Sequence, residues 1–243
     1  MKRIIATIIW TTLLLSLLSS CSSNDWDYKS RRIGTDRNYE WVEITRYKGV
    51  GHNVKIPAKL GGNPVEAIGE NAFDNCTSVR SIIIPDSVVS IGRLAFIGCT
   101  NLTAITIPDS VTEIGQQAFE DCTSLSTVTL SLNLRRITGS LFMNCTVLTS
   151  VNIPDGITEI GPRAFYNCIS IKEITIPNSV TSIGFEAFSG CSGLTSLMIP
   201  DSVIKIDTFP NGAFDNCSQL TVTYKGNSYS FESFDVLYDV ING

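Results

Sequence analysis

The sequence is poor in the residues from which most catalytic centres are built. Its 243 residues include one histidine, His52, and charged residues make up only 17% of the chain. No Ser/His/Asp or Cys/His arrangement can be assembled around His52 on sequence grounds. A phosphate-binding glycine loop and a His-Cys metal spacing are also missing. We therefore expect no enzyme activity, no cofactor and no metal, and we interpret His52 as a surface bystander.

Long basic runs are missing as well. Lys and Arg together number 18 against 23 Asp and Glu, which gives a net charge of −5 at pH 7. Nucleic acid is therefore excluded as a partner on charge grounds. Paired carboxylates do occur, as at Glu120-Asp121. A hydrolase that uses two acids stays open as an alternative, but we expect these carboxylates to be solvated on an outward turn.

The N-terminus has the pattern of an export signal. A basic start at Lys2-Arg3 precedes an almost wholly apolar run over residues 4–18, which suits a signal peptide better than a membrane span. The ending Leu18-Ser19-Ser20-Cys21 resembles a bacterial lipobox, which would make Cys21 the lipidated first residue. Simple secretion is the alternative. Residues 22–27 are polar and acidic, as in the surface-export tethers of lipoproteins from the Bacteroides group.

Cysteine and phenylalanine recur at a fixed interval. Six cysteines are spaced 23 residues apart, a seventh follows after 26, and each has a phenylalanine three residues before it. These cysteines are Cys76, Cys99, Cys122, Cys145, Cys168, Cys191 and Cys217. A proline after an isoleucine keeps the same period, except at Ser131. A fixed period of this length indicates stacked units that bury their apolar faces only against each other.

One inner repeat shows how the unit should fold. Ile105 and Ile107 flank Thr106 with the period of a strand, and Pro108 lacks the N–H needed to continue it. Gly115 permits a corner, and residues 116–121 fit one helical turn that places Phe119 inside. The residue before each cysteine is Asn, Asp or Gly, the types that tolerate left-handed backbone. The sequence predicts a β-rich, curved, right-handed solenoid with parallel strands and short helical turns, in seven repeats of about 23 residues.

The cysteines should be free thiols, because parallel side chains in register hold their Cβ atoms farther apart than a disulfide prefers. The predicted organisation has five parts. These are a lipoprotein signal peptide (1–20), a flexible tether (21–40), an N-terminal cap strand (41–53), the solenoid (54–222) and a C-terminal cap (223–243). The C-terminal cap should contain a hairpin over residues 223–229 and a helix that presents Phe234, Leu237 and Val240.

The repeat unit itself resembles a known family. Its consensus is Ile-Pro-Asp-Ser-Val-Thr-Glu-Ile-Gly-x-x-Ala-Phe-x-x-Cys-Thr-x-Leu, and it matches from about Val54 to Leu220. This pattern resembles the BspA-like leucine-rich repeat proteins. The resemblance implies a leucine-rich repeat solenoid on a bacterial surface, and some members adhere to host extracellular proteins or to other cells. The fourth repeat departs from the pattern, because Ser131 replaces Pro, Leu132-Asn133 replaces Asp-Ser and Thr138 replaces Gly.

Outward side chains of the strands form the candidate binding surface. Read across repeats, they give a nearly uncharged, hydroxyl-rich surface suited to hydrogen-bonding an extended partner. The candidate residues are Thr106, Thr129, Asn152, Thr175, Ser150 and Glu173. A purely structural interpretation competes with this one, because β-branched threonine suits strand pairing.

Two other patterns have weaker claims. Glu113, Arg136 and Glu159 alternate in sign at successive repeats and should form a surface salt-bridge ladder, which would control register more than stability. The turns at residues 86–88, 109–111 and 201–203 read Asp-Ser-Val, which resembles a bacterial O-glycosylation acceptor. A recurring turn that happens to match the acceptor is the alternative that we favour.

The sequence therefore predicts a non-catalytic repeat protein that binds macromolecules. The resemblance implies adhesion-type binding of a protein or glycoprotein, with the host extracellular matrix as one source of partners. We expect it to be a monomer at the outer membrane or cell surface, attached to the membrane only through lipid on Cys21. The alternatives are a glycan-handling accessory lipoprotein and an envelope scaffold. Exposed aromatic residues, which would favour sugar stacking, are missing from the outward strand positions.

Overall fold

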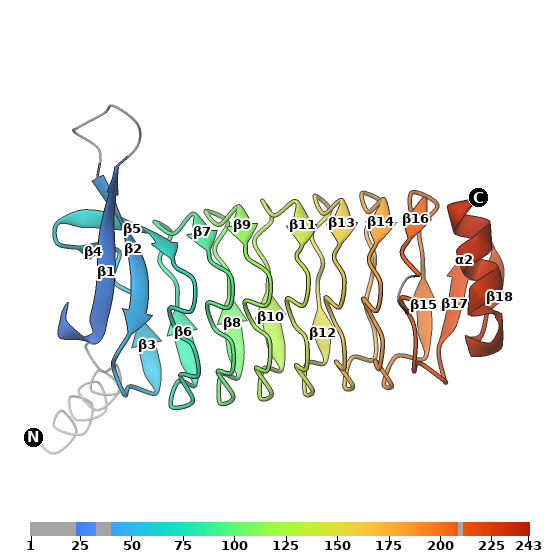
Figure 1. The fold of residues 1–243 in the computed structure, drawn as a ribbon, viewed down its shortest axis with the longest axis horizontal. Coiled ribbons are helices and arrows are strands. Elements are labelled where there is room, and N and C mark those ends of the chain that lie inside the picture. Colours follow the sequence, from blue (N-terminus) through green and yellow to red (C-terminus); the bar gives the residue numbers. More distant parts are fainter. Residues whose placement is uncertain (1–22, 33–39, 209–210) are drawn as a thin grey trace, which may run out of the picture.

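The structure is a computed structural model that describes residues 23–32, 40–208 and 211–243. These residues form an elongated stack of repeats whose axis runs nearly straight, with the described ends of the chain at opposite ends of the stack (Figure 1). The predicted solenoid of parallel strands is confirmed, since successive repeats pair in parallel and in register. The proposed signal peptide and Cys21 lie outside the described residues.

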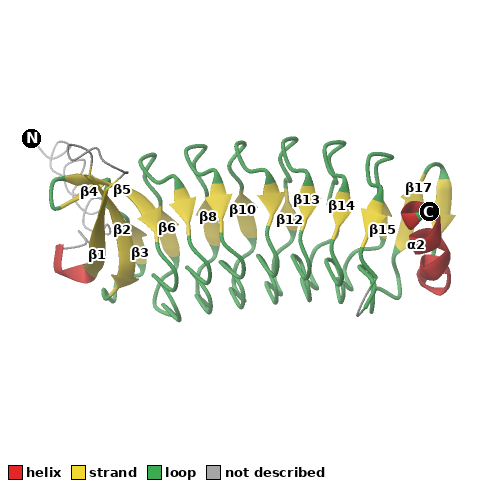
Figure 2. Ribbon diagram, turned by 45° about the horizontal axis from the view of Figure 1, so that its top comes forward, coloured by secondary structure: helices red, strands yellow, loops and turns green. Residues whose placement is uncertain are grey.

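Two columns of short strands run along the stack, and Figure 2 shows the strands of successive repeats lined up between projecting loops. The first column carries the outward residues proposed for binding. It contains β3 (Asn53–Lys55), β6 (Ser81–Ile83), β8 (Ala104–Thr106), β10 (Thr127–Thr129) and β12 (Ser150–Val151), and it continues after a gap as β15 (Ser196–Met198), β17 (Thr221–Tyr224) and β18 (Asn227–Tyr229). Asn152 and Thr175 form an isolated parallel bridge within this gap.

The second column forms two sheets. The first contains β1 (Trp26–Arg32), β2 (Glu40–Tyr47), β5 (Asn63–Ile68), β7 (Ser90–Ile91) and β9 (Glu113–Ile114), with β4 (Lys59–Leu60) beside β5; the second contains β11 (Arg136–Ile137), β13 (Glu159–Ile160), β14 (Ser182–Ile183) and β16 (Lys205–Ile206). The helical elements are η1 (Ser23–Asp25), η2 (Phe231–Ser233) and α2 (Phe234–Asn242). The column is therefore interrupted between β9 and β11.

The third side of each repeat is a pair of turns, and the helical turn expected over residues 116–121 is wrong. Both Gln117 (φ 61°) and Asp121 (φ 58°) have left-handed backbone, which a right-handed helix cannot contain. Every second N–H consequently points along the stack. Gln117, Phe119 and Asp121 donate to the carbonyls of Gly139, Leu141 and Met143 in the next repeat, at 3.0, 3.0 and 2.9 Å. Neighbouring repeats are therefore hydrogen-bonded on this side too.

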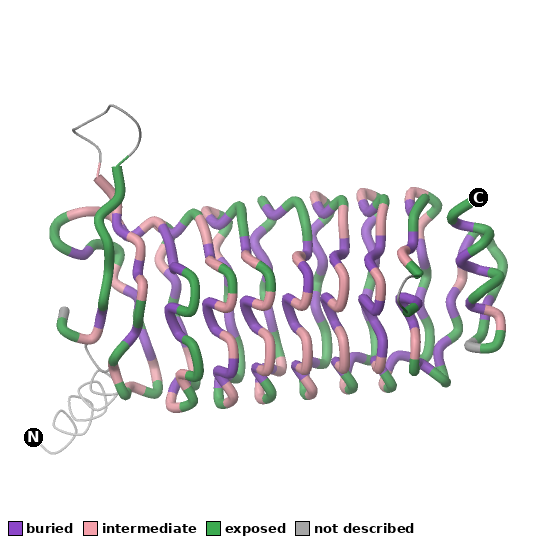
Figure 3. Tube along the Cα trace, viewed as in Figure 1, coloured by how far each residue is buried: buried purple, intermediate pink, exposed green. Residues whose placement is uncertain are grey.

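A column of phenylalanine rings fills the core. Successive rings are stacked with centroids 4.9–5.9 Å apart, and all seven are fully buried. Figure 3 shows the same alternation of buried and exposed positions recurring from one repeat to the next. The column ends on aromatic residues at both termini. Trp26 and Tyr47 contact Phe73 at one end, and Phe234 and Tyr238 contact Phe214 at the other.

The repeat cysteines are free thiols, as predicted, and six of the seven are buried. They also form hydrogen bonds that the sequence did not reveal. The thiol of Cys122 donates to the Phe96 carbonyl at 3.2 Å, and that carbonyl also accepts the N–H of Cys99. The same contact recurs along the stack at 3.1–3.2 Å. Cysteine is therefore a small apolar residue that also supplies a donor to the neighbouring repeat.

Glycine at the corner after the second strand sets how closely repeats approach. A Cβ on Gly115 would lie 2.3 Å from the Arg93 nitrogen, and a Cβ on Gly184 would lie 2.4 Å from the Pro162 nitrogen. The fourth repeat has Thr138 at this corner, and its hydroxyl donates to the Gly115 carbonyl at 3.1 Å. We attribute the interruption between β9 and β11 to this side chain. The Cβ of Thr138 occupies space into which, at the glycine corners, the backbone of the preceding repeat fits.

The N-terminal cap is larger than predicted, and the expectation of a tether over residues 21–40 is wrong for residues 26–32. These residues form β1, which pairs antiparallel with β2 along its whole length. Trp26 is 3% exposed and packs on Tyr47 with ring centroids 4.9 Å apart. The N-terminal cap strand predicted within residues 41–53 is confirmed as β2, which ends at Tyr47 and buries Val42 and Ile44. Polar residues surround Trp26 in the sequence and concealed this strand.

The C-terminal cap closes each side of the stack by a different contact. The hairpin of β17 and β18 ends the first column, as predicted. The Asn242 side chain accepts the Ile206 N–H and donates to its carbonyl, both at 2.9 Å, and so replaces a neighbouring strand at β16. The Tyr238 hydroxyl accepts the Phe214 N–H at 3.2 Å. The helix buries Phe234, Leu237, Tyr238 and Ile241, so the prediction that Val240 packs inside is wrong.

The corner glycines generate a stability prediction. Gly115→Ala should destabilise the fold by roughly 1–3 kcal/mol, the cost of overpacking, because the new Cβ would overlap the backbone of the preceding repeat. The matched control is Thr138→Ala, which keeps a Cβ where one already exists and should cost about 0.5–1.5 kcal/mol for the lost hydrogen bond. Chemical denaturation measures both. A Gly115→Ala variant as stable as the wild type would contradict the proposed packing limit.

The buried thiols generate a prediction about pH. Burial raises the pKa of the Cys122 thiol from 9.0 to about 12. Its contribution to stability should be complete below pH 9 and should be lost as the pH rises towards 12, because the unfolded chain releases this proton first. In Cys122→Ala, the fall of unfolding free energy over this range should be shallower by roughly 1 kcal/mol per pH unit. Identical slopes for the variant and the wild type would contradict a buried, protonated Cys122.

Candidate functional site

The candidate surface is the strand face, defined as two rows of outward side chains on the first strand column. The first row contains Ile83, Thr106, Thr129, Asn152, Thr175 and Met198, and the second contains Ser81, Ala104, Thr127, Ser150, Glu173 and Ser196. Strand pairing places Thr106 beside Thr129, and Thr127 beside Ser150. The six residues predicted for binding are all exposed. They lie on one surface of the molecule.

Hydroxyl groups at the edge of the strands differ from those on the strand face. Thr103, Ser126 and Thr149 each donate to a carbonyl of the preceding repeat, at 3.2, 3.0 and 3.2 Å. Their hydroxyls therefore serve the stack. Within the described part of the chain, the side chains of the six candidate residues have no hydrogen-bond partner. Their donors and acceptors are available to another molecule.

A shallow groove lies between the first row and the turns that follow it. Ile83, Asp86, Thr106 and Asp109 line one part. The groove continues along Thr106 and Asp109 to Thr129, Leu132 and Asn152. Leu132 is 63% exposed. Its position in the fourth repeat corresponds to that of Asp109 in the third. The sequence predicted recurring structural turns here, with glycosylation as the alternative, but did not identify them as walls of a groove.

A second groove lies at the interruption between β9 and β11. It is lined by residues 112–115 of the third repeat, by residues 134–136 and Thr138 of the fourth, and by Trp41, Glu43 and Glu70 near the N-terminal cap. The predicted salt-bridge ladder along this side is wrong, since Glu113, Arg136 and Glu159 form no ion pair with each other. The interruption separates Glu113 from Arg136, and long exposed side chains gain little by pairing.

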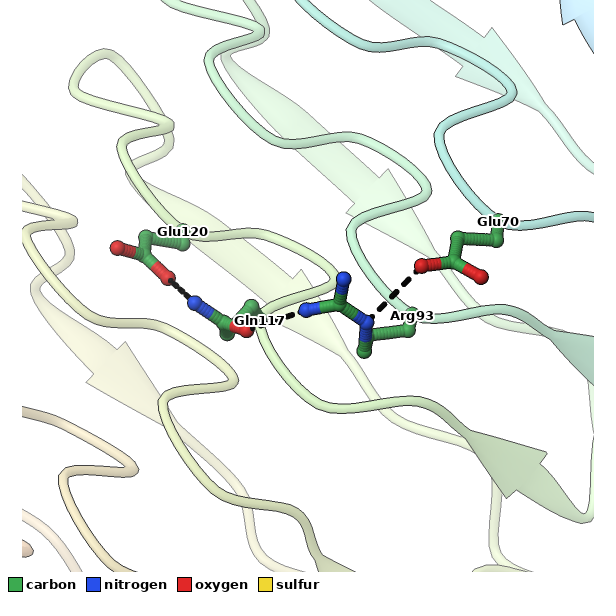
Figure 4. Close-up of polar contacts among 4 residues, drawn as sticks. All are labelled: Glu70, Arg93, Gln117 and Glu120. Atoms are coloured by element: carbon green, nitrogen blue, oxygen red, sulfur yellow. Dashed lines mark hydrogen bonds and ion pairs between the residues drawn. The ribbon is translucent and has the colours of Figure 1, made fainter.

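Polar side chains also connect repeats on the turn side, as Figure 4 shows. Arg93 donates to Glu70 and to Gln117, each at 3.0 Å, and Gln117 donates to Glu120 at 2.8 Å. The Arg93–Glu70 pair is half exposed on both sides, so it contributes about 0–1 kcal/mol. In contrast to the six candidate residues of the strand face, these four side chains already have partners within the stack.

The Asp-Ser-Val turns have a structural role. Ser87, Ser110 and Ser202 donate to carbonyls of the preceding repeat at 2.7, 2.7 and 2.8 Å, and all three are half-buried. Ser131 performs the same role in the irregular fourth repeat, where it donates to the Val111 carbonyl at 2.6 Å. These contacts favour the recurring turn over the glycosylation acceptor, because the hydroxyl of each serine is held against the backbone.

Groups suited to catalysis or metal binding are sparse in the described residues. No cluster of three or more His, Cys, Asp and Glu side chains there could hold a metal ion. Nδ1 of the exposed His52 lies 2.8 Å from the Ser78 carbonyl. Burial raises the pKa of the repeat thiols, to about 12 for Cys168, so they are protonated and poor nucleophiles near neutral pH. Among the helices described, none is long and apolar enough to cross a membrane.

The comparisons with known families agree with this architecture. A family model described as the BspA type leucine-rich repeat region matches residues 52–172 and 136–235. The chain therefore belongs to the BspA-type leucine-rich repeat family, as the resemblance in its sequence implied. Comparison with curated proteins gives no significant match.

Solved bacterial structures are also similar. A leucine-rich cell surface protein from Faecalibacterium prausnitzii shares 34% identity with a TM-score of 0.70, covering 83% of this chain and 59% of that one. A leucine-rich repeat protein from T. pallidum shares 29% with a TM-score of 0.56, covering 83% and 80%. Another, from Eubacterium ventriosum, shares 25% with a TM-score of 0.66, covering 86% and 56%. This chain thus spans less than two thirds of two of these relatives.

Proposed function

We propose that this protein is a non-catalytic, adhesion-type receptor at the bacterial surface, whose strand face binds a protein or glycoprotein. One observation carries the proposal. Aligned side chains across successive repeats, from Thr106 to Thr175, expose hydrogen-bonding groups that have no partner within the described chain. The hydroxyls of Thr103 and Ser126, at the edge of the strands, donate to the preceding repeat and hold the stack together. The exposed row makes no such contact, so strand pairing alone does not explain it.

The family supports the protein-binding part of this proposal, because repeat solenoids present long regular surfaces to macromolecules. The surface location is supported by the relative from Faecalibacterium prausnitzii, which is described as a cell surface protein. Lipid on Cys21 would attach the chain to the outer membrane or cell surface. We propose a monomer, with the host extracellular matrix as one source of partners. The glycan-handling and scaffold alternatives lack a comparable observation, since neither row of the strand face contains an aromatic residue.

The test introduces charge at the centre of the strand face. Thr129→Arg combined with Asn152→Arg should leave the melting temperature nearly unchanged, because both residues are exposed. Binding to immobilised matrix proteins and mucin should nevertheless weaken, because two bulky cations would occupy the groove. The measurement is solid-phase binding of the purified protein together with thermal denaturation.

The control places the same charges on the turn side. Gln116→Arg combined with Glu120→Arg should leave binding intact. If binding survives the strand-face pair and fails with the turn-side pair, the binding surface lies on the turns and the proposal is wrong.

A further inference from the structure

We propose that the strand face takes a basic polypeptide segment in the polyproline II conformation, which runs along the solenoid axis with a lysine or arginine at every third residue. The inference rests on the proposed function, because it gives the chemistry of the partner for the same surface. Charge, spacing and hydrogen bonding each contribute to it.

Negative charge lines one edge of the strand face. The turn after each strand carries an exposed aspartate in four repeats, and these residues, Asp86, Asp109, Asp155 and Asp201, are here called the acidic edge. None of the four forms an ion pair within the described part of the chain. Asp86 and Asp109 line the groove. Carboxylates without a cationic partner, beside a strand face whose one charged side chain is the acidic Glu173, are complementary to a cationic partner.

The opposite edge of the strand face, formed by the residue just before each strand, carries no carboxylate. The cations of a bound segment would therefore be directed to the acidic edge. Arg80 and Lys172 lie on that edge, with the uncharged Thr195 in the repeat after Lys172, and the positions between the two basic residues are the uncharged Thr103, Ser126 and Thr149. The hydroxyls of these three residues are already hydrogen-bonded within the stack. Apart from Glu173 in the second row of the strand face, the carboxylates that a basic side chain can reach therefore lie along the acidic edge and not along the opposite one.

The spacing of the acidic edge matches the repeat of a polyproline II helix. From Asp109 onwards the aspartates are two repeats apart, because the intervening positions are Leu132 and Asn178. Strands are roughly 4.8 Å apart, which places these carboxylates roughly 10 Å from each other. In polyproline II, side chains three residues apart project on the same side and are roughly 9.3 Å apart. Same-face side chains of an extended β-strand are roughly 6.7 Å apart and do not match.

Hydrogen bonding distinguishes polyproline II from a helix. An α-helix with basic residues seven apart would repeat at roughly 10.5 Å and would also match the acidic edge. Its backbone groups are paired internally, however, so the free side chains of Thr106, Thr129 and Asn152 would gain little from it. A polyproline II backbone has no internal hydrogen bonds, and it can use these groups directly.

The test uses a defined peptide and the full chain. We would measure binding of a labelled (Pro-Ala-Lys)6 peptide by fluorescence anisotropy at low salt, because exposed charges are screened as salt rises. The comparison peptides are (Pro-Ala-Glu)6 and a peptide of the same composition with irregular lysine spacing. We expect the regular lysine peptide to bind tightest. Comparable affinity for all three peptides would overturn the inference.

Matched variants then locate the site. Asp109→Asn combined with Asp155→Asn should weaken binding of the lysine peptide roughly tenfold, as expected for two exposed ion pairs. The asparagine at position 109 keeps an acceptor for the Leu132 N–H, which now donates to Asp109 Oδ1 at 2.8 Å. The control is Glu113→Gln combined with Glu159→Gln, which removes two carboxylates that are likewise two repeats apart, on the other strand column. Equal loss with both pairs would overturn the inference.

The outcomes separate this inference from the proposed function. If the lysine peptide fails to bind while capture of matrix proteins still depends on Thr129 and Asn152, the partner is not basic, and the proposed function stands. If the peptide binds and only the control pair weakens it, the basic partner binds the other column, and the inference is wrong. If neither peptide nor matrix proteins depend on the strand face, both proposals fail.

Discussion

Stacking at strand spacing is the constraint on which the rest of this structure depends. On the turn side, every second N–H of one repeat donates to a carbonyl of the next, as Phe119 does to Leu141. The thiol of Cys122 and the corner at Gly115 require the same close approach. A single repeat therefore cannot satisfy its own backbone, and buried unpaired groups are costly. The fold is stable only as an array with closed ends.

The geometry of the proposed binding surface follows from this constraint. Because the stack fixes the distance between strands, it also fixes the distance between Thr106 and Thr129 and between successive turns. The side chains on the strand face need no hydrogen bonds of their own to stay in place, which leaves them available to a partner. The irregular fourth repeat alters this surface, since Leu132 adds an exposed apolar side chain where its neighbours have aspartate.

The sequence predicted the repeat, the buried phenylalanines and the exposure of the strand face because these depend on residue type and period. It also predicted left-handed backbone before each cysteine, where Asn, Asp and Gly occur. It did not predict the second left-handed position, because Leu94 and Gln117 have no such preference and only the neighbouring repeats impose it. Thr103 and Thr106 look alike in sequence, although one hydroxyl is hydrogen-bonded within the stack and the other is free. Contacts between repeats therefore decide what the period alone does not.

Continuity of the core from repeat to repeat is the central claim. Native-state hydrogen exchange of a Phe119→Ala variant tests this continuity most directly. The Phe119 ring stacks on Phe96 and Phe142 with centroids 5.2 and 5.7 Å apart, and its loss should cost about 3–5 kcal/mol. If repeats are stable only through their neighbours, amide protection should fall in the repeats of Phe96 and Phe142 as well as in that of Phe119. Loss of protection confined to residues 102–124 would contradict a continuous stack.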